Sequence, residues 1–130
     1  MPIFSVRKLP NLTKRPINLL EREGKCLWND FKNEIKADNN LKPELTRLFA
    51  IVEDAANNKN PSKSKFKPLK SISKTYTVYE ARSTNLRLYV FSENITGVIV
   101  VLGGKKTTQD SDLKRMKQLM KEYTNFKNKS

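Results

Sequence analysis

Two arginines separated by a short polar turn are the residues best suited to hold a phosphate. If Ser83–Leu86 forms the loop of a hairpin, Arg82 and Arg87 face each other across it, with Cβ atoms about 5 Å apart. Like charges placed directly opposite each other destabilise a sheet, so a shared phosphate or partner carboxylate would explain the pair. The alternatives are two solvated arginines, or salt bridges to Glu80 and Glu93.

A glycine pair followed by two lysines and two hydroxyl side chains is a second candidate phosphate site. Gly103 and Gly104 come directly after an apolar run and would let the backbone approach a ligand closely. Lys105, Lys106 and Thr107 follow them, although the spacing does not match a Walker loop. The alternative is an ordinary strand-to-helix turn with solvated lysines.

The stretch 59–74 contains six lysines and no acidic residue. Its prolines and serines predict an irregular connecting loop. A run of charge is often a solvated face, but the interleaved Phe66 and the nearby Tyr76 offer stacking surfaces for bases. The lysines that we expect to contact RNA are Lys63, Lys65, Lys67, Lys70 and Lys74.

The composition excludes several classes of site. The 130 residues include no histidine, which removes His-based acid–base catalysis, and we expect no metal site and no cofactor. Asp110 and Asp112 are interpreted as residues at a helix start rather than as an acid–base pair. The single cysteine, Cys26, cannot form an internal disulfide and indicates a reducing compartment, most simply the cytoplasm.

The charge balance points to an anionic partner. The chain has 26 Lys and Arg against 13 Asp and Glu, a net charge of +13. Such a field attracts phosphate polyanions or an acidic protein. No apolar run approaches the ~20 residues that span a bilayer, and the basic start lacks the apolar stretch of a secretory signal, so we expect no membrane association.

Changes of period along the chain predict the elements that position these residues. We expect a strand over 4–9, helices over 25–37 and 41–56, strands over 75–82, 86–91 and 97–102, and a final helix. The order β-α-α-β-β-β-α predicts a single α+β domain over 1–130, with a helical hairpin packed on a small antiparallel or mixed sheet. The fully apolar 97–102 strand should be central, next to the N-terminal strand. Residues 126–130 should be a frayed tail.

The second half, over about residues 65–125, resembles the RelE/ParE toxin superfamily and is closest to its phage-derived, HigB-like branch. The motifs that carry the resemblance are Glu80-Ala81-Arg82, Arg87-Leu88-Tyr89 and Lys105-Lys106-Thr107, in that order and spacing. Gly104 stands where the branch often has an aromatic residue, and no histidine is present for an acid–base role.

The resemblance implies a RelE-like fold and the toxin of a bacterial type II toxin–antitoxin system. Such a toxin cleaves mRNA on the ribosome, inhibits translation, and is neutralised by a cognate antitoxin, here through an acidic segment. By the same resemblance, Arg82, Arg87, Lys105 and Lys106 would hold the scissile phosphate and be the catalytic residues.

That chemistry needs no metal, because the RNA 2′-hydroxyl attacks its own phosphate. Arginine suits charge stabilisation, whereas a lysine beside other cations can titrate near neutrality, so Lys105 or Lys106 is the expected acid or base. The alternative function is a non-catalytic basic module of the same fold. It would inhibit gyrase as ParE-type relatives do, or bind nucleic acid or protein.

Overall fold

Alternating and helical patterns along the chain become a mixed sheet and three helices. The computed structural model describes residues 2–129 and shows an α+β arrangement with six strands. The elements are β1 (Phe4–Lys8), β2 (Ile17–Arg22), α1 (Leu27–Ile35), α2 (Lys42–Ala56), β3 (Phe66–Pro68), β4 (Thr77–Arg82), β5 (Leu86–Glu93), β6 (Gly97–Lys105), a 3₁₀ turn η1 (Lys106–Thr108) and α3 (Gln109–Lys129).

Strand β2 is an additional strand, which the sequence pattern did not predict, between the expected first strand and the expected first helix. Its first four residues are all buried, because Ile17 and Leu19 pack in the core beneath α1 and α2 and Leu20 packs in the core beneath α3. A strand covered on both faces carries apolar residues without alternation, so its sequence lacks the period-two signal. Strand β3 was likewise expected to be part of an irregular loop, and it forms a short edge strand within 59–74.

Strand β6 is central, as expected, but its second neighbour is not the first strand. The sheet order is β1-β2-β6-β5-β4-β3. β2 pairs with β6 in parallel and the other neighbouring strands pair antiparallel. β2 pairs with β6 at Val98–Val100, and among the described residues no strand pairs with the rest of that edge of β6.

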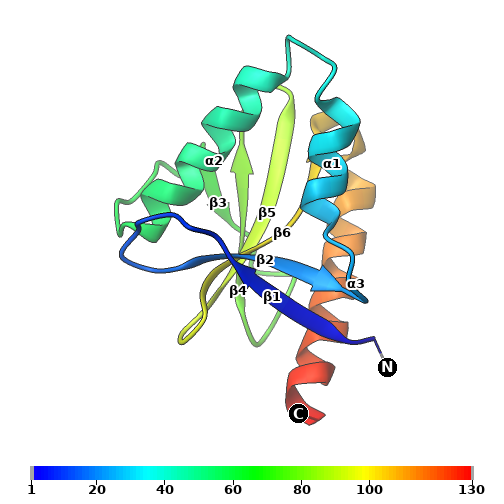
Figure 1. Cartoon of the computed structure of the whole chain (residues 1–130). Coiled ribbons are helices and arrows are strands. Elements are labelled where there is room, and N and C mark those ends of the chain that lie inside the picture. The colour runs from blue at the N-terminus through cyan, green and yellow to red at the C-terminus, as the bar shows by residue number, and fades with distance from the viewer. Residues whose placement is uncertain (1, 130) are drawn as a thin grey trace.

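The sheet is the middle of three layers. Figure 1 shows α1 and α2 over one face and α3 behind the other. Trp28 of α1 and Leu48 of α2 pack with Leu88 of β5 in one core, whereas Met116 of α3 packs with Tyr89 in the other. The connection between α1 and α2 lies at the same end of the sheet as the β4–β5 turn (Figure 1), and this end carries the candidate site.

A β-bulge in β6 sets which face each of its last residues presents. The register of β6 against β5 shifts between Tyr89 and Val90, which leaves Val101 as the extra residue. As a result, Val101 and Leu102 both pack on the α3 side. Alternation then turns Gly103 toward α1 and Gly104 toward α3.

The two glycines lie inside the strand, which corrects the expectation that they end it. A Cβ on Gly103 would lie 2.6 Å from the Phe31 ring and 2.8 Å from the Trp28 ring. A Cβ on Gly104 would overlap the Asp112 carboxylate. Because neither glycine has a side chain, the rings of α1 and the Asp112 carboxylate can approach β6 closely. The strand continues past both glycines to Lys105.

Helix α3 is longer than expected. It extends to Lys129, so residues 126–129 are helical rather than a frayed tail, and Ser130 lies outside the described residues. Phe126 packs on Phe4 with ring centroids 5.7 Å apart, which anchors the last turns to β1. Within residues 2–129, none of the helices is both apolar enough and long enough to cross a bilayer.

Candidate phosphate-binding site

Four neighbouring strands align the predicted cations at one end of the sheet. Arg82 pairs directly with Arg87, which in turn pairs with Gly104, so the predicted hairpin register is confirmed. The Arg82 amide donates to the Lys65 carbonyl at 2.8 Å, which places Lys65 beside this line at the β3 edge. Side chains opposite each other in an antiparallel pair share a face, so Lys65, Arg82 and Arg87 all belong to the α3 face.

Lys67 belongs to the same face because it pairs with Glu80 two residues along β4. Both lysines are exposed. We call Lys65, Lys67, Arg82 and Arg87 the basic row. Adjacent strands lie about 4.8 Å apart, so the row sets its side chains at a regular spacing across the end of the sheet.

Glu80 holds Arg82 in place. The Arg82 Nε donates to Glu80 Oε1 at 2.6 Å, and the Gln109 amide donates to the other carboxylate oxygen at 2.8 Å. Burial of Glu80 disfavours its ionisation, but these hydrogen bonds and the nearby Tyr89 hydroxyl outweigh it and hold the pKa of Glu80 below its usual range. Arg82 keeps 29% of its side chain exposed. Glu80 therefore orients the guanidinium from the protein interior, while part of the group remains accessible to a ligand.

Arg87 is buried, so the alternative of two solvated arginines is wrong for this residue. The residue is 7% exposed, and its Nη1 donates to the carbonyls of Ser83 and Leu86 at 2.8 and 2.9 Å. Among residues 2–129 its buried Nε finds no hydrogen-bond partner. The buried Arg87 side chain therefore bonds to the β4–β5 turn, whereas the Arg82 guanidinium is partly exposed to solvent.

The β4–β5 turn is also fixed from the other face. Glu44 of α2 is buried and accepts hydrogen bonds from the Ser83 hydroxyl and from the backbone and side-chain amides of Asn85, the latter two at 2.8 Å. Burial of Glu44 works against ionisation, but these hydrogen bonds keep the pKa of Glu44 below its usual range. The turn that spaces the two arginines is thus held between α2 and Arg87.

Lys105, Lys106 and Thr107 reach the same end of the sheet but face a different hollow. The Lys106 amide donates to the Asn85 carbonyl at 2.8 Å, which joins η1 to the β4–β5 turn. Lys105 and Thr107 line a groove of about 600 Å³ between α1 and α3, together with Asp112 and Arg115. We call this the α1–α3 groove. The four expected catalytic residues therefore divide between the basic row, η1 and this groove.

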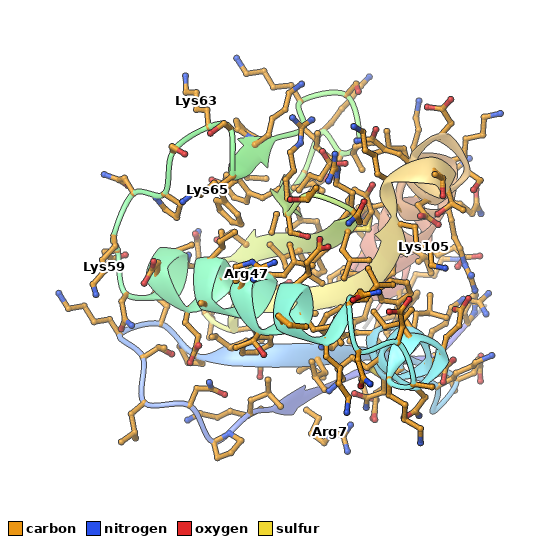
Figure 2. The ribbon with its side chains drawn as sticks, turned by 90° about the horizontal axis from the view of Figure 1, so that it is seen from above. Arg7, Arg47, Lys59, Lys63, Lys65 and Lys105 are labelled. Carbon is orange, nitrogen blue, oxygen red and sulfur yellow. The ribbon has the colours of Figure 1, made fainter. Side chains whose placement is uncertain are left out.

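The remaining lysines predicted to contact RNA do not gather with the basic row. Lys63 lines a hollow of about 410 Å³ on the α2 face, beside the stacked rings of Phe66 and Tyr79. Lys74 lines a groove along α3, and Lys70 is exposed in the turn between β3 and β4. Figure 2 shows Lys63 and Lys65 on the β3 side and Lys105 on the opposite side of this end.

The residues that complete the site were not assigned to it from sequence. Glu80 was named as a possible ion-pair partner of Arg82, and its position two residues earlier on the strand was the available signal. Glu44, Gln109 and Asp112 come from distant elements, and no local pattern marks them. In residues 2–129 no three Cys, Asp or Glu side chains gather as a metal ion would require.

Comparison with known proteins adds no relative to this description. No protein-family model, curated protein or solved structure matches the chain. The resemblance to the RelE/ParE superfamily therefore rests on the order and spacing of the motifs in its second half.

Proposed function

We propose that the protein is the toxin of a bacterial type II toxin–antitoxin system with a RelE-like fold. It would act in the cytoplasm as a ribosome-dependent, metal-independent mRNA endoribonuclease that inhibits translation. The observation that supports the proposal is the shared face that Lys65, Lys67 and Arg82 occupy at one end of the sheet, with Lys106 tied to the β4–β5 turn. Several cations fixed at one end of a sheet fit a strand of phosphates better than a single small anion.

The basic row would bind the RNA backbone through its exposed members. Arg82 is oriented by Glu80 and presents an always-charged fork that can stabilise charge on phosphate oxygens. Lys65 and Lys67 add flexible point charges on the same face. Arg87 contributes by shaping the turn, since its side chain is bonded to the turn's own carbonyls.

The partner that neutralises this surface would be an antitoxin with an acidic segment. Lys65, Lys67 and the outer part of Arg82 form a surface of one sign, which a run of carboxylates complements. The segment would compete directly with RNA for the same cations. Full RNA binding by the complex of toxin and neighbouring-gene product would contradict this placement.

A non-catalytic binding module of the same fold is the second candidate. The burial of Arg87 and the separation of Lys105 from Arg82 favour it, because they divide the expected catalytic set. Such a module would bind RNA, or a protein such as gyrase, without breaking bonds. The two candidates share the basic row and differ in whether RNA is cut.

Induced expression followed by mapping of mRNA 5′ ends tests the proposal. The wild-type chain should arrest growth and produce new mRNA ends, and translating ribosomes should be required in a purified system. The Lys65→Ala/Lys67→Ala double variant should bind RNA more weakly with a shallower salt dependence. Lys8→Ala, an exposed lysine on β1 at the opposite edge of the sheet, is the matched control and should behave as wild type.

Each candidate has a separate outcome in this experiment. RNA binding without new ends, at wild-type expression, would reject the nuclease and leave the binding module. Equal loss in the Lys8→Ala control would show that net charge rather than the basic row governs binding.

A further inference from the structure

The α1–α3 groove lies beside the last part of β6, beyond the residues that pair with β2. β2 pairs with β6 no further than Val100, so within the described residues the last part of that edge is flanked by helices instead of a strand. Lys25 enters the groove from the α1 side, Lys105 and Thr107 from the end of β6 and η1, and Arg115 from α3. The same groove is also lined by Asp30, Glu34 and Asp112, so it carries charges of both signs. It is adjacent to the η1 turn that contacts Asn85.

Asp112 forms the floor of this groove, and a hydrogen bond holds its carboxylate. Its carboxylate lies where a side chain of Gly104 would begin, directly over β6 on the α3 face. The Thr108 hydroxyl donates to Asp112 Oδ2 at 2.7 Å, which sets the orientation of the carboxylate. Gly104 pairs with Arg87. The Asp112 carboxylate, which lies over Gly104, is therefore next to Arg87 on the same face of the sheet.

The surroundings of Asp112 favour exchange of a proton. Burial raises the pKa of Asp112, the hydrogen bond from Thr108 and the charge of Arg115 oppose that rise, and Glu34 adds to it. Glu80, the other carboxylate near Tyr89, is shifted the opposite way and stays ionised. A pair of carboxylates whose environments separate their pKa values is a common arrangement at catalytic sites.

The charged and titratable groups that face Asp112 come from every element around it. They are Lys25, Asp30 and Glu34 on the α1 side, Lys105 on β6, Arg115 on α3, and Tyr89 on β5. Lys25 is ion-paired with Asp30 at 3.4 Å, so Lys105 and Arg115 are the cations left to hold an anion near the carboxylate.

We infer that Asp112 is the general base of RNA cleavage and that the scissile phosphate binds in the α1–α3 groove. This inference rests on the proposed function. In the step, the 2′-hydroxyl proton passes to the Asp112 carboxylate as O2′ forms a bond to phosphorus. The bond from phosphorus to O5′ breaks, and O5′ takes a proton from the Lys105 ammonium. Asp112 then releases its proton to water and Lys105 takes one up from water, which restores both groups. The products are a 2′,3′-cyclic phosphate and a 5′-hydroxyl.

Asp112 fits this role better than Glu80 or the arginines at this end of the sheet. The chain has no histidine, and guanidinium groups do not accept protons at neutral pH. Glu80 is fully buried and its oxygens already accept hydrogen bonds from Arg82 and Gln109. Asp112 combines a fixed position with an open groove, which is the geometry that a base requires.

The decisive variants are Asp112→Asn and Gly104→Ala. Asparagine can still accept from Thr108 but cannot take a proton, so cleavage should fall by about 10²–10⁴-fold. A methyl group on Gly104 would displace the Asp112 carboxylate, which is the flexible end of its side chain. Gly104→Ala should therefore reproduce the loss, and the double variant should be no slower than Asp112→Asn alone. Asp110→Asn, exposed in the same helical turn, is the control and should cleave at the wild-type rate.

The readouts are single-turnover cleavage of ribosome-bound mRNA from pH 4.5 to 8, RNA affinity, the chemistry of the new 3′ end, and thermal melting. Asp112→Asn should keep RNA affinity and folding, and should lose the fall in rate that wild type shows on acidification. An unchanged rate and pH profile in Asp112→Asn, with an active wild type, would overturn the inference and leave the proposed function standing. A wild type that never cuts RNA would overturn both, and a 3′-phosphate formed without a cyclic intermediate would overturn the mechanism.

Discussion

Arg82 and Arg87 face each other directly across the β4–β5 ladder, yet their guanidinium groups bind different partners. Arg82 turns to Glu80 on its own strand, and Arg87 turns to the carbonyls of Ser83 and Leu86. A shared anion is therefore not needed to separate the two charges. The pair instead divides its roles, with Arg82 at the surface and Arg87 beneath the turn.

We expect Arg87→Met to destabilise the fold. Because the Arg87 side chain bonds to the turn, we expect it to take no direct part in RNA binding. The substitution preserves the apolar stem but removes the hydrogen bonds to two carbonyls, and bonds from a charged donor contribute about 1.5–3 kcal/mol. Urea unfolding should show a lower midpoint with an unchanged slope. An unchanged midpoint would show that the buried guanidinium does not stabilise the turn.

Glu80 should make stability depend on acid pH. Its pKa in the folded state lies below the unfolded value of about 4.3, so its contribution is present above that pH and is lost as pH falls through the folded-state pKa. Glu80→Gln should therefore be less stable than wild type at pH 7, and the difference should shrink near pH 3. Denaturant unfolding at the two pH values checks this, and a difference that grows on acidification would contradict the sign.

The sequence was sufficient for elements with a strong local pattern. Alternation over 75–82 and 86–91, with a polar turn between them, predicted the hairpin. The register that places Arg82 opposite Arg87 was an assumption about the length of the loop, and the structure has that register. The apolar stripe over 41–56 similarly predicted α2. In each case the signal lies within a few neighbouring residues and agrees with the tertiary environment.

The misses have a common physical origin in long-range packing. β2 lacks alternation because helices cover both faces of the sheet there, and the burial of Arg87 is not encoded near position 87. Asp112 has the sequence signature of a helix start, and its place over Gly104 depends on a bulge at Val101 and on how α3 crosses the sheet. Such positions are set by contacts between elements, which a local pattern does not contain.

Gly103→Ala should test how closely α1 approaches β6. The added methyl group would meet the rings of Phe31 and Trp28 at 2.6 and 2.8 Å, and both rings are buried in the core. Overpacking of this kind costs about 1–3 kcal/mol. Thermal melting should therefore show a clear loss for Gly103→Ala and a smaller one for Gly104→Ala, whose neighbour is a movable carboxylate. Equal losses would mean that α1 shifts easily away from the sheet.

Asp112→Asn should stabilise the folded state at neutral pH even as it removes cleavage. The pKa of Asp112 is raised in the folded state above the unfolded value of about 3.9, chiefly by burial. The folded state therefore binds the proton more tightly, and ionisation at pH 7 costs stability that an uncharged asparagine does not lose. Below both pKa values the wild-type carboxyl is neutral as well, so the advantage of the variant should disappear. Urea unfolding at pH 7 and pH 3.5 measures this difference without any RNA. A variant less stable than wild type at pH 7 would mean that the carboxylate stabilises the fold. A gain in stability together with a loss of cleavage is expected for a catalytic carboxylate that is destabilising in the folded state.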